Sequence, residues 1–568
     1  MIRLCLAQVN PTIGDLEGNA SMLKRAIAGA RAQGGDLVAF PELVITGYPP
    51  DDLLLSAAFV ADSRRALESV AEATDGITAI VGCVDRSEGR LYSAAAFLTN
   101  GRVQGVYHKR HLPNYGVFDE RRFFSRGSEV VLGSIDAVTF GVTVCEDLWV
   151  QNGPHRACAA AGASLVVNIN ASPYHAGKGR ERLDMLSRRA RENGLTIAYV
   201  NCVGGADEVV FDGQSCIVNA DGSLAARAAQ FTEELLTFDF DPESAPVLDA
   251  EIADLARFEP ETVAVMNLAQ LEHADHAPLD VRVAEVMSPS EEVYCALVTG
   301  VRDYLHKNSF RQAIVGLSGG IDSALTAAIA VDALGAPNVL GISNPSEFTS
   351  PQSIQTTKQL AHNLGIELVT MPIGTALDAM RKTLEVDFPQ DEPGVADQNL
   401  QSRIRGALWM AVSNLTGRIV LSTGNKSELA VGYATLYGDM VGGFAALKDV
   451  PKTLVYQLAD WRNRDTELIP DEIIRRPPTA ELAPNQLDTD ALPPYEVLDP
   501  ILDGLIAGHL SIEELVEQGF DRDVVVSVAS MVDRAEFKRR QAPPGVKITR
   551  RAFGRDRRLP ITNRYRRR

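Results

Sequence analysis

The chain has 568 residues, which is more than one ordinary hydrophobic core accommodates, so two domains of roughly 250–300 residues each are expected. Hydrophobic residues make up 45% and charged residues 23% of the sequence, as in a soluble globular protein, and the net charge of −19 argues against a general nucleic-acid binder. The N-terminus alternates like a strand, and no stretch approaches the roughly 18 uncharged apolar residues of a membrane span. We therefore expect a cytoplasmic protein with neither a nucleic acid nor a membrane as its partner.

The seven cysteines are an odd number and include no C-x-x-C pair. This count argues against a disulfide framework and against a zinc site of the usual spacing. Most of these cysteines are expected to be small core residues, and Cys145 is the one that allows a different interpretation.

The charge is distributed unevenly, because residues 538–568 hold thirteen Lys and Arg and a single acid, Asp556. One interpretation is a solvated or disordered basic tail. Another is that the inner part of this segment packs on the body of the protein and meets an anionic ligand. Nucleic-acid binding is a more distant third.

Strands and helices alternate along the first 240 residues. The predicted strands cover residues 2–9, 36–40, 77–83, 93–98, 138–145, 165–170, 197–201 and 215–219. The predicted helices cover residues 19–32, 154–161 and 178–193. Short turns at Asn100-Gly101 and Asp221-Gly222 pair some of the strands directly. This mixture favours a sheet layered with helices over a pure βαβ repeat.

Acidic residues and prolines dominate residues 242–279, which we interpret as a surface connector with boundaries at 246 and 284. A second alternating pattern follows. Its predicted helices cover residues 291–306, 321–334, 351–364 and 398–415, and its predicted strands cover residues 313–316, 339–342, 367–371 and 419–422. This β-α-β-α order predicts a doubly wound parallel sheet with ligands at the carboxyl ends of its strands.

Three potentially reactive residues, Glu42, Lys109 and Cys145, each lie near the end of a strand in the front half. Alone, a cysteine after an apolar strand is more often a buried core thiol. Together, the three residues could catalyse the hydrolysis of an amide. Cys145 could attack the amide carbon as a thiolate. Glu42 could take the thiol proton and return it to the leaving ammonia, and Lys109 could stabilise the oxyanion and lower the thiol pKa.

These residues, in this order, resemble the Glu-Lys-Cys triad of the nitrilase superfamily, and the resemblance covers residues 1–245. Residues 112–120, 168–174 and 201–208 agree with it. The resemblance implies a layered α-β-β-α domain, with Glu120 as a second acidic residue beside the triad. It also implies that glutamine is bound by Tyr115, Glu146, Ser172 and Lys178; the alternative is that these four are ordinary loop hydrogen-bonders.

A glycine-rich loop, SGGIDS, lies between a predicted strand and a predicted helix in the back half. Its six residues are Ser318, Gly319, Gly320, Ile321, Asp322 and Ser323. It lacks the Gly-Lys-Ser/Thr of a Walker loop. Two glycines allow the backbone to approach a phosphate, the helix N-terminus offers free N–H groups, and the hydroxyls can donate. Asp322 could hold a magnesium ion that bridges phosphates.

This loop resembles that of the ATP pyrophosphatases of the N type, which have an adenine nucleotide α hydrolase-like fold and activate an acyl group as its adenylate. Within that class, residues 399–405, 423–439, 448–449 and 492–495 look like NAD synthetase, over about residues 285–545. The resemblance implies Mg²⁺ as the metal, held by Asp322 and Glu428. ATP would be bound by the SGGIDS loop with Arg403, Thr423 and Thr435. Deamido-NAD would be bound by Asn399, Asn425, Glu428, Asp439, Lys448 and Lys538. No family role is assigned to the basic residues 546–568.

The fusion of the two halves resembles the glutamine-dependent NAD synthetases. It implies that ammonia from glutamine passes through an internal tunnel and amidates deamido-NAD in an ATP-dependent ligase reaction that yields NAD, AMP, pyrophosphate and glutamate. It also implies a homo-oligomer assembled through the synthetase domain. Two alternatives stay open: an amidotransferase for another acceptor, and a binding or scaffolding protein with inactive sites.

Overall fold

The computed structural model describes residues 1–136, 138–244, 263–268, 279–388 and 394–565. The chain forms two compact units. The first, called here the front unit, contains Met1–Ala206 and Val210–Met287; the second, the back unit, contains Ser288–Arg568 with the short segment Asp207–Val209.

Two mixed sheets form the centre of the front unit. The six-stranded sheet has the order β14-β1-β2-β3-β4-β5 and the seven-stranded sheet has the order β13-β12-β9-β8-β7-β6-β15. The strands of the first sheet are β1 (Ile2–Gln8), β2 (Leu37–Ala39), β3 (Thr78–Ser87), β4 (Arg90–Thr99), β5 (Arg102–His108) and β14 (Glu234–Phe240). Those of the second are β6 (Val130–Ile135), β7 (Val138–Val144), β8 (Leu165–Asn170), β9 (Thr196–Asn201), β12 (Cys216–Val218), β13 (Leu224–Arg227) and β15 (Val263–Asn267). A small sheet pairs β10 (Val203–Ala206) with β11 (Val209–Asp212).

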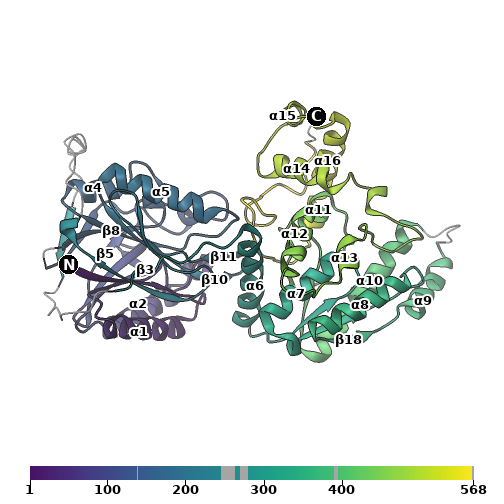
Figure 1. The fold of residues 1–568 in the computed structure, drawn as a ribbon, viewed down its shortest axis with the longest axis horizontal. Coiled ribbons are helices and arrows are strands. Elements are labelled where there is room, and N and C mark those ends of the chain that lie inside the picture. Colours follow the sequence, from purple (N-terminus) through teal and green to yellow (C-terminus); the bar gives the residue numbers. More distant parts are fainter. Residues whose placement is uncertain (137, 245–262, 269–278, 389–393, 566–568) are drawn as a thin grey trace. The chain divides into compact units, whose positions relative to one another are not determined.

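Helices cover the outer faces of both sheets (Figure 1). The apolar sides of α1 (Leu16–Ala32) and α2 (Ala57–Ala71) pack on the first sheet, and those of α4 (Pro154–Ala160) and α5 (Lys178–Asn193) pack on the second. The inner faces of the two sheets meet in one core. Because both faces of β1 are covered, all seven of its residues are buried. This is the expected α-β-β-α layering, and the fold class of the front half is confirmed.

The strand β15 lies inside the predicted connector, where no strand was expected. Its residues alternate in exposure, and Ala264 and Met266 pack on the core between the sheets. A five-residue strand among prolines and acids is too short to stand out in the sequence. Most of the predicted connector, at residues 245–262 and 269–278, lies outside the described residues.

The back unit contains a five-stranded parallel sheet of order β18-β17-β16-β19-β20. Its strands are β16 (Ala313–Gly316), β17 (Val339–Ser343), β18 (Glu367–Thr370), β19 (Ile419–Ser422) and β20 (Phe444–Ala445). Strand order reverses between β16 and β19, and ligands of such sheets bind at the carboxyl ends beside that point. The predicted doubly wound parallel sheet is confirmed.

Helices connect and extend this sheet (Figure 1). They are α6 (Pro289–Lys307), α7 (Ile321–Leu334), α8 (Pro351–Leu364), α9 (Gly374–Glu385), α10 (Val395–Thr416), α11 (Lys426–Val431), α12 (Lys452–Arg462), α13 (Asp471–Arg475), α14 (Tyr495–Ile506), α15 (Ile512–Glu517), α16 (Arg522–Arg534) and α17 (Glu536–Arg539). A second apolar core joins α11 to α14, α15 and α16. Over the described residues, no helix combines the length and the apolar character needed to cross a membrane.

The basic C-terminal segment is not a solvated tail along its inner part. Val546 and Ile548 are completely buried, and Phe553 packs in the core around α11. The prediction that the inner part packs on the body is therefore confirmed, whereas no observation bears on the anionic ligand.

Candidate functional sites

In the front unit, Glu42 follows β2, Lys109 follows β5 and Cys145 follows β7. The structure brings all three into the interior, where their exposed fractions are 1%, 0% and 4%. Lys109 Nζ lies 2.7 Å from Glu42 Oε1 and 2.8 Å from Glu120 Oε2. Ser93 donates a hydrogen bond to Glu42 (3.1 Å) and Tyr48 donates one to Glu120 (3.0 Å). A buried ammonium thus lies between two carboxylates whose positions are fixed by further hydrogen bonds.

The charges in this cluster are strongly coupled. Burial lowers the pKa of Lys109, but Glu120 and Glu42 outweigh it and raise that pKa well above its usual value. Burial raises the pKa of Glu120 to about 7, against the opposing charge of Lys109. Burial and Glu42 raise the pKa of Cys145, and Lys109 offsets only part of this rise. The expectation that Lys109 lowers the pKa of the thiol is therefore wrong for the resting protein. The thiol is protonated and needs a base to become a nucleophile.

Cys145 adopts a strained backbone conformation with φ of +43°, which is rare for a residue with a side chain. Its N–H donates to the carbonyl of Ile169 (2.9 Å), and its carbonyl accepts from the N–H of Leu148 (3.1 Å). These bonds hold a sharp turn between β7 and the short helix α3 (Glu146–Trp149). The turn presents Cys145 at the end of the strand, as nucleophiles of strand–turn–helix sites require.

Asp147 is a fully buried residue that sequence reasoning did not single out. Its carboxylate accepts from the N–H groups of Val144 (3.1 Å), Arg110 (3.1 Å) and His111 (2.8 Å) and from the Tyr107 hydroxyl (2.7 Å). It therefore ties the loop that carries Lys109 to the turn that carries Cys145. Only the tertiary contacts reveal this role, since an acid two residues after a cysteine has no distinctive pattern.

The four predicted glutamine-binding residues surround the same region. The Tyr115 hydroxyl donates to Glu146 Oε2 (2.9 Å), and Lys178 Nζ lies 3.9 Å from the centre of the Trp149 ring. Cys145 is close enough to affect the pKa of both Tyr115 and Lys178. Ser172 is buried, and its N–H donates to the side chain of Asn201 (2.9 Å).

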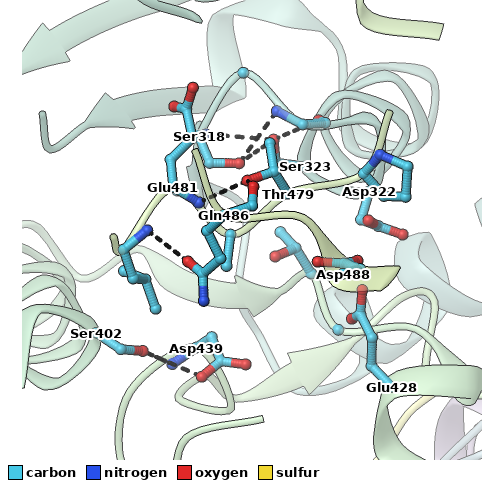
Figure 2. Close-up of a pocket in the computed structure, with 18 of the residues that line it drawn as sticks. Ser318, Asp322, Ser323, Ser402, Glu428, Asp439, Thr479, Glu481, Gln486 and Asp488 are labelled. Carbon is cyan, nitrogen blue, oxygen red and sulfur yellow. Dashed lines mark hydrogen bonds between the residues drawn. The ribbon is translucent and has the colours of Figure 1, made fainter. Parts of the chain in front are cut away.

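The back unit has a pocket of about 510 Å³ at the carboxyl ends of its central strands (Figure 2). Twelve of the residues predicted to bind nucleotide line it: Ser318, Gly319, Gly320, Ile321, Asp322, Ser323, Asn399, Thr423, Glu428, Thr435, Asp439 and Lys538. Asn399 and Thr435 share a hydrogen bond of 2.7 Å, and Asp439 accepts from the Thr435 N–H (2.7 Å) and from Ser402 (3.1 Å).

The SGGIDS loop has the geometry of an anion-binding turn. Gly319 has φ of +84°, and a Cβ at this position would lie 3.0 Å from atoms of Ser353. The Ser323 hydroxyl donates to the carbonyl of Gly320 (2.9 Å), and the Gly320 N–H donates to the Ser318 hydroxyl (3.2 Å). The loop opens directly into the 14-residue helix α7, whose N-terminal N–H groups favour a negatively charged ligand.

Asp322 and Glu428 lie on either side of Lys452, which sequence reasoning missed. Lys452 Nζ contacts the Asp322 carboxylate and lies 3.4 Å from Glu428 Oε1. Asn425 caps α11 and donates to Asp322 Oδ1 (2.9 Å). A third carboxylate, Asp488, lines the same pocket and points toward the same space (Figure 2).

Asp322 and Glu428 supply carboxylate oxygens, which Mg²⁺ prefers as ligands, while within the described residues no three His, Cys, Asp or Glu side chains are grouped to hold a metal ion. Burial and the charge of Asp322 raise the pKa of Glu428 to about 8, and Lys452 only partly offsets them. At neutral pH Glu428 therefore keeps its proton in the ligand-free pocket, and a cation bound there would displace that proton.

Three predicted ligand residues point elsewhere. Arg403 Nε donates to the carbonyl of Leu436 (3.2 Å) and lies outside the lining set, whereas Arg405, two residues later, lines the pocket. Asn425 acts as the helix cap described above. Lys448 lies 2.7 Å from Glu208 Oε1, in the segment that groups with the back unit.

Comparisons with known proteins assign each half of the chain to a family. The family model described as carbon-nitrogen hydrolase matches residues 3–247, and the one described as NAD synthase matches residues 293–542. The glutamine-dependent NAD(+) synthetase of Thermotoga maritima is 46% identical over 99% of both chains. The structure of the Acinetobacter baumannii glutamine-dependent NAD+ synthetase in complex with ADP is similar, with a TM-score of 0.75 and 38% identity over 99% of this chain and 98% of that chain. The Cytophaga hutchinsonii glutamine-dependent NAD(+) synthetase shares the fold, with a TM-score of 0.81 and 22% identity over 99% of this chain and 98% of that chain.

The protein is thus a fusion of a carbon–nitrogen hydrolase domain with an NAD synthase domain. More specifically, its similarity along the whole chain places it in one family. The chain belongs to the glutamine-dependent NAD(+) synthetases.

Proposed function

We propose that this chain converts deamido-NAD to NAD with ammonia that its front unit releases from glutamine. The observation that carries the proposal is the pairing, in one chain, of a buried Glu42–Lys109–Cys145 cluster with a pocket lined by the SGGIDS loop. Either site alone is compatible with several reactions, whereas together they fit a glutaminase that supplies an amidating synthetase. The nearly full-length similarity to NAD synthetases favours deamido-NAD over other acceptors.

In the front unit, Cys145 attacks the side-chain amide carbon of glutamine after Glu42 removes the thiol proton. The carbonyl oxygen becomes an oxyanion beside the Lys109 ammonium, which stabilises it. Glu42 then returns the proton to the amide nitrogen, the C–N bond breaks, and ammonia leaves with a thioester remaining on Cys145. Water, deprotonated by Glu42, hydrolyses that thioester to glutamate and regenerates the thiol. Tyr115, Glu146, Ser172 and Lys178 bind the rest of the glutamine.

In the back unit, the nicotinate carboxylate of deamido-NAD attacks the α-phosphorus of ATP, and pyrophosphate leaves. The SGGIDS loop and the N-terminus of α7 hold the phosphates. Ammonia then attacks the carbonyl carbon of the acyl adenylate, and AMP leaves as NAD forms. Thr423 and Thr435, which line the pocket, hold the nucleotide, and Arg405 takes the role that was expected of Arg403. The predicted residues that line the pocket, Asn399, Glu428, Asp439 and Lys538, bind deamido-NAD. Asn425 acts through its hydrogen bond to Asp322, and Lys448 is paired with Glu208.

Asp322 and Glu428 would hold magnesium, which supplies positive charge that neutralises the phosphates and favours the departure of pyrophosphate. The Lys452 ammonium lies between these two acids and adds a positive charge beside them. Its ammonium thus holds Asp322 and Glu428 together and would add to the positive charge that a metal supplies to the phosphates.

Transfer of ammonia inside the protein is part of the proposal. At neutral pH most free ammonia is ammonium, which is not a nucleophile, so a direct route keeps the nitrogen unprotonated. We further expect a homo-oligomer that assembles through the synthetase domain.

The test is NAD formation from deamido-NAD and Mg-ATP, with either glutamine or an ammonium salt, by the wild type, Cys145→Ala and Cys158→Ala. Cys158 is a buried thiol against Gly141 in the outer layer and serves as the matched control. We expect Cys145→Ala to lose only glutamine-supported synthesis and Cys158→Ala to keep both. Glutamine-supported synthesis by Cys145→Ala would overturn the nucleophile, and no NAD from the wild type with either donor would overturn the acceptor.

A further inference from the structure

The most basic part of the chain is built into the back unit. In residues 546–557, Lys547 and Arg557 are only 6% and 4% exposed. Lys547 Nζ contacts Asp556 (2.5 Å) and the carbonyl of Thr549 (2.6 Å), so its charge is neutralised within the segment. Just before it, the carbonyl of Pro544 accepts from the N–H of Ala445 in the central sheet (2.8 Å). This segment, which we call the strap, therefore behaves as an element of the fold.

One anchor of the strap is the fully buried carboxylate of Asp449. It accepts from the N–H of Ile548 (2.8 Å) and from both the N–H (2.7 Å) and the hydroxyl (2.8 Å) of Thr549. Lys426 Nζ lies 2.8 Å from Asp449 Oδ1 and donates to the Thr549 hydroxyl (2.6 Å) and the Arg551 carbonyl (2.9 Å). Lys426 is the first residue of α11, so Thr549 joins the strap to the start of that helix.

A second anchor lies at the end of α11. Phe553 of the strap packs in one apolar cluster with residues 429–431 of the helix. Arg539 donates to the carbonyl of Ala430 (2.5 Å) and to Glu536 (2.9 Å), and Glu536 also accepts from Arg557 of the strap (2.7 Å). The strap thus contacts the first turn of α11 directly and its last turn through packing and through Glu536.

The helix α11 has only six residues, and its own hydrogen bonds are too few to hold it rigidly. Yet it carries Glu428, and its cap Asn425 donates to Asp322. We infer that residues 546–557 are a positioning strap that holds α11, and with it Asn425 and Glu428, at the distance from Asp322 that the ATP pocket requires. This inference rests on the proposed ATP site, and it assigns a role to a segment that contributes no side chain to the pocket lining.

Thr549→Val tests the strap with a minimal change, because it removes the hydroxyl that bonds to Lys426 and Asp449 and keeps the shape. Thr549→Ser retains the hydroxyl and is the matched rescue variant. A chain that ends at Arg558 removes the last ten residues, with four arginines, and leaves the strap intact. The readouts are hydrogen exchange of the α11 amides in the ligand-free protein, KM and kcat for ATP in ammonium-supported synthesis, and glutaminase activity.

We expect Thr549→Val to exchange its α11 amides about tenfold faster and to raise the KM for ATP about tenfold, as the loss of hydrogen bonds to charged groups implies. Glutaminase activity, Thr549→Ser and the shortened chain should match the wild type. The positioning role of the strap would be overturned if Thr549→Val left both the exchange of the α11 amides and the KM for ATP unchanged. A lower melting temperature without either change would overturn it as well. An equal effect in the shortened chain would assign the role to net charge instead. Failure of the wild type to make NAD would overturn the proposed function, while the exchange data would still decide whether the strap holds α11.

Discussion

Each unit places one buried lysine between two carboxylates, and the surroundings of the two lysines differ. Lys109 is completely buried between Glu42 and Glu120, in a cluster with Cys145. Lys452, 2% exposed, lies between two acids that line a pocket of about 510 Å³. A closed cluster suits covalent chemistry on a small amide, because few groups must be fixed exactly where charge develops. An open pocket suits large nucleotides that are positioned mainly by loops and charges.

Both sites combine a lysine with two acids, but the surroundings of these side chains differ. In the front unit Lys109 is enclosed by Glu42 and Glu120, which are themselves buried. In the back unit burial and the charge of Asp322 raise the pKa of Glu428 to about 8, so Glu428 is mostly protonated at neutral pH while Lys452 contacts Asp322. The two lysines thus differ in their access to ligands, since one lies in a closed cluster and the other lies beside a pocket.

The largest effect is expected from Asp322→Asn, which breaks only the back site. Because a metal that neutralises phosphates is worth several kcal/mol, NAD synthesis should fall at least about 100-fold with glutamine and with ammonium alike. Glutaminase activity should persist, since Asp322 belongs to the other unit. A loss confined to glutamine-supported synthesis would contradict the assignment of Asp322 to the synthetase site.

Glu120→Gln should sharpen the account of the front site. We expect kcat for glutamine hydrolysis to fall about 100-fold, because Lys109 loses one of its two buried carboxylates. The wild-type rate should rise with pH through about 7, where Glu120 ionises, and this step should vanish in the variant. The controls are ammonium-supported synthesis, which should not change, and Ser69→Ala, which removes a part-buried hydroxyl that donates to the carbonyl of Ala66 within α2.

The same titration has a consequence for stability. The folded pKa of Glu120 is raised from 4.5 to about 7, so the protonated acid stabilises the fold below about pH 4.5 and this contribution is lost as pH rises to 7. The free energy of unfolding of the wild type should therefore decline relative to Glu120→Gln between pH 4.5 and 7. Denaturant titrations at several pH values measure the difference, and parallel curves would contradict the raised pKa.

A smaller effect is expected from Arg405, which distinguishes the structure from the sequence-based expectation for Arg403. Arg405 lines the pocket, and burial lowers its pKa to about 10. Arg405→Met should raise the KM for ATP about tenfold, as expected when a charged hydrogen-bonding group is lost. Arg403→Met is the matched variant and should change the KM for ATP less than Arg405→Met does. A larger change in Arg403→Met would favour Arg403 as the ATP-binding arginine.

The smallest effect is expected from Trp149, whose ring lies 3.9 Å from Lys178 Nζ. A cation–π contact of this kind stabilises the position of the lysine by about 1 kcal/mol, so Trp149→Leu should raise the KM for glutamine about fivefold with kcat unchanged. Trp149→Phe retains an aromatic face, so its KM for glutamine should lie between those of the wild type and Trp149→Leu. Equal KM values in all three proteins would show that Trp149 does not position Lys178.

Regular elements could be predicted from the sequence, and contacts between distant segments could not. Buried strands such as residues 165–170 and the loop from Ser318 to Ser323 have local patterns, so their structures were foreseen. Asp147 and Lys452 have roles only because the fold brings partners to them. Packing of the basic segment on the body was one of two open interpretations of the sequence. Its anchors on Asp449 and Glu536 could not be predicted, because its buried residues are too few to form a periodic pattern.

The central claim is that ammonia from the front unit reaches the adenylate in the back unit without mixing with the solvent. The direct measurement supplies glutamine labelled with ¹⁵N at its amide together with an excess of unlabelled ammonium, and determines the ¹⁵N content of the NAD that forms. We predict that nearly all the new amide nitrogen is ¹⁵N under saturating glutamine. NAD labelled only in proportion to the mixed ammonia pool would contradict the claim.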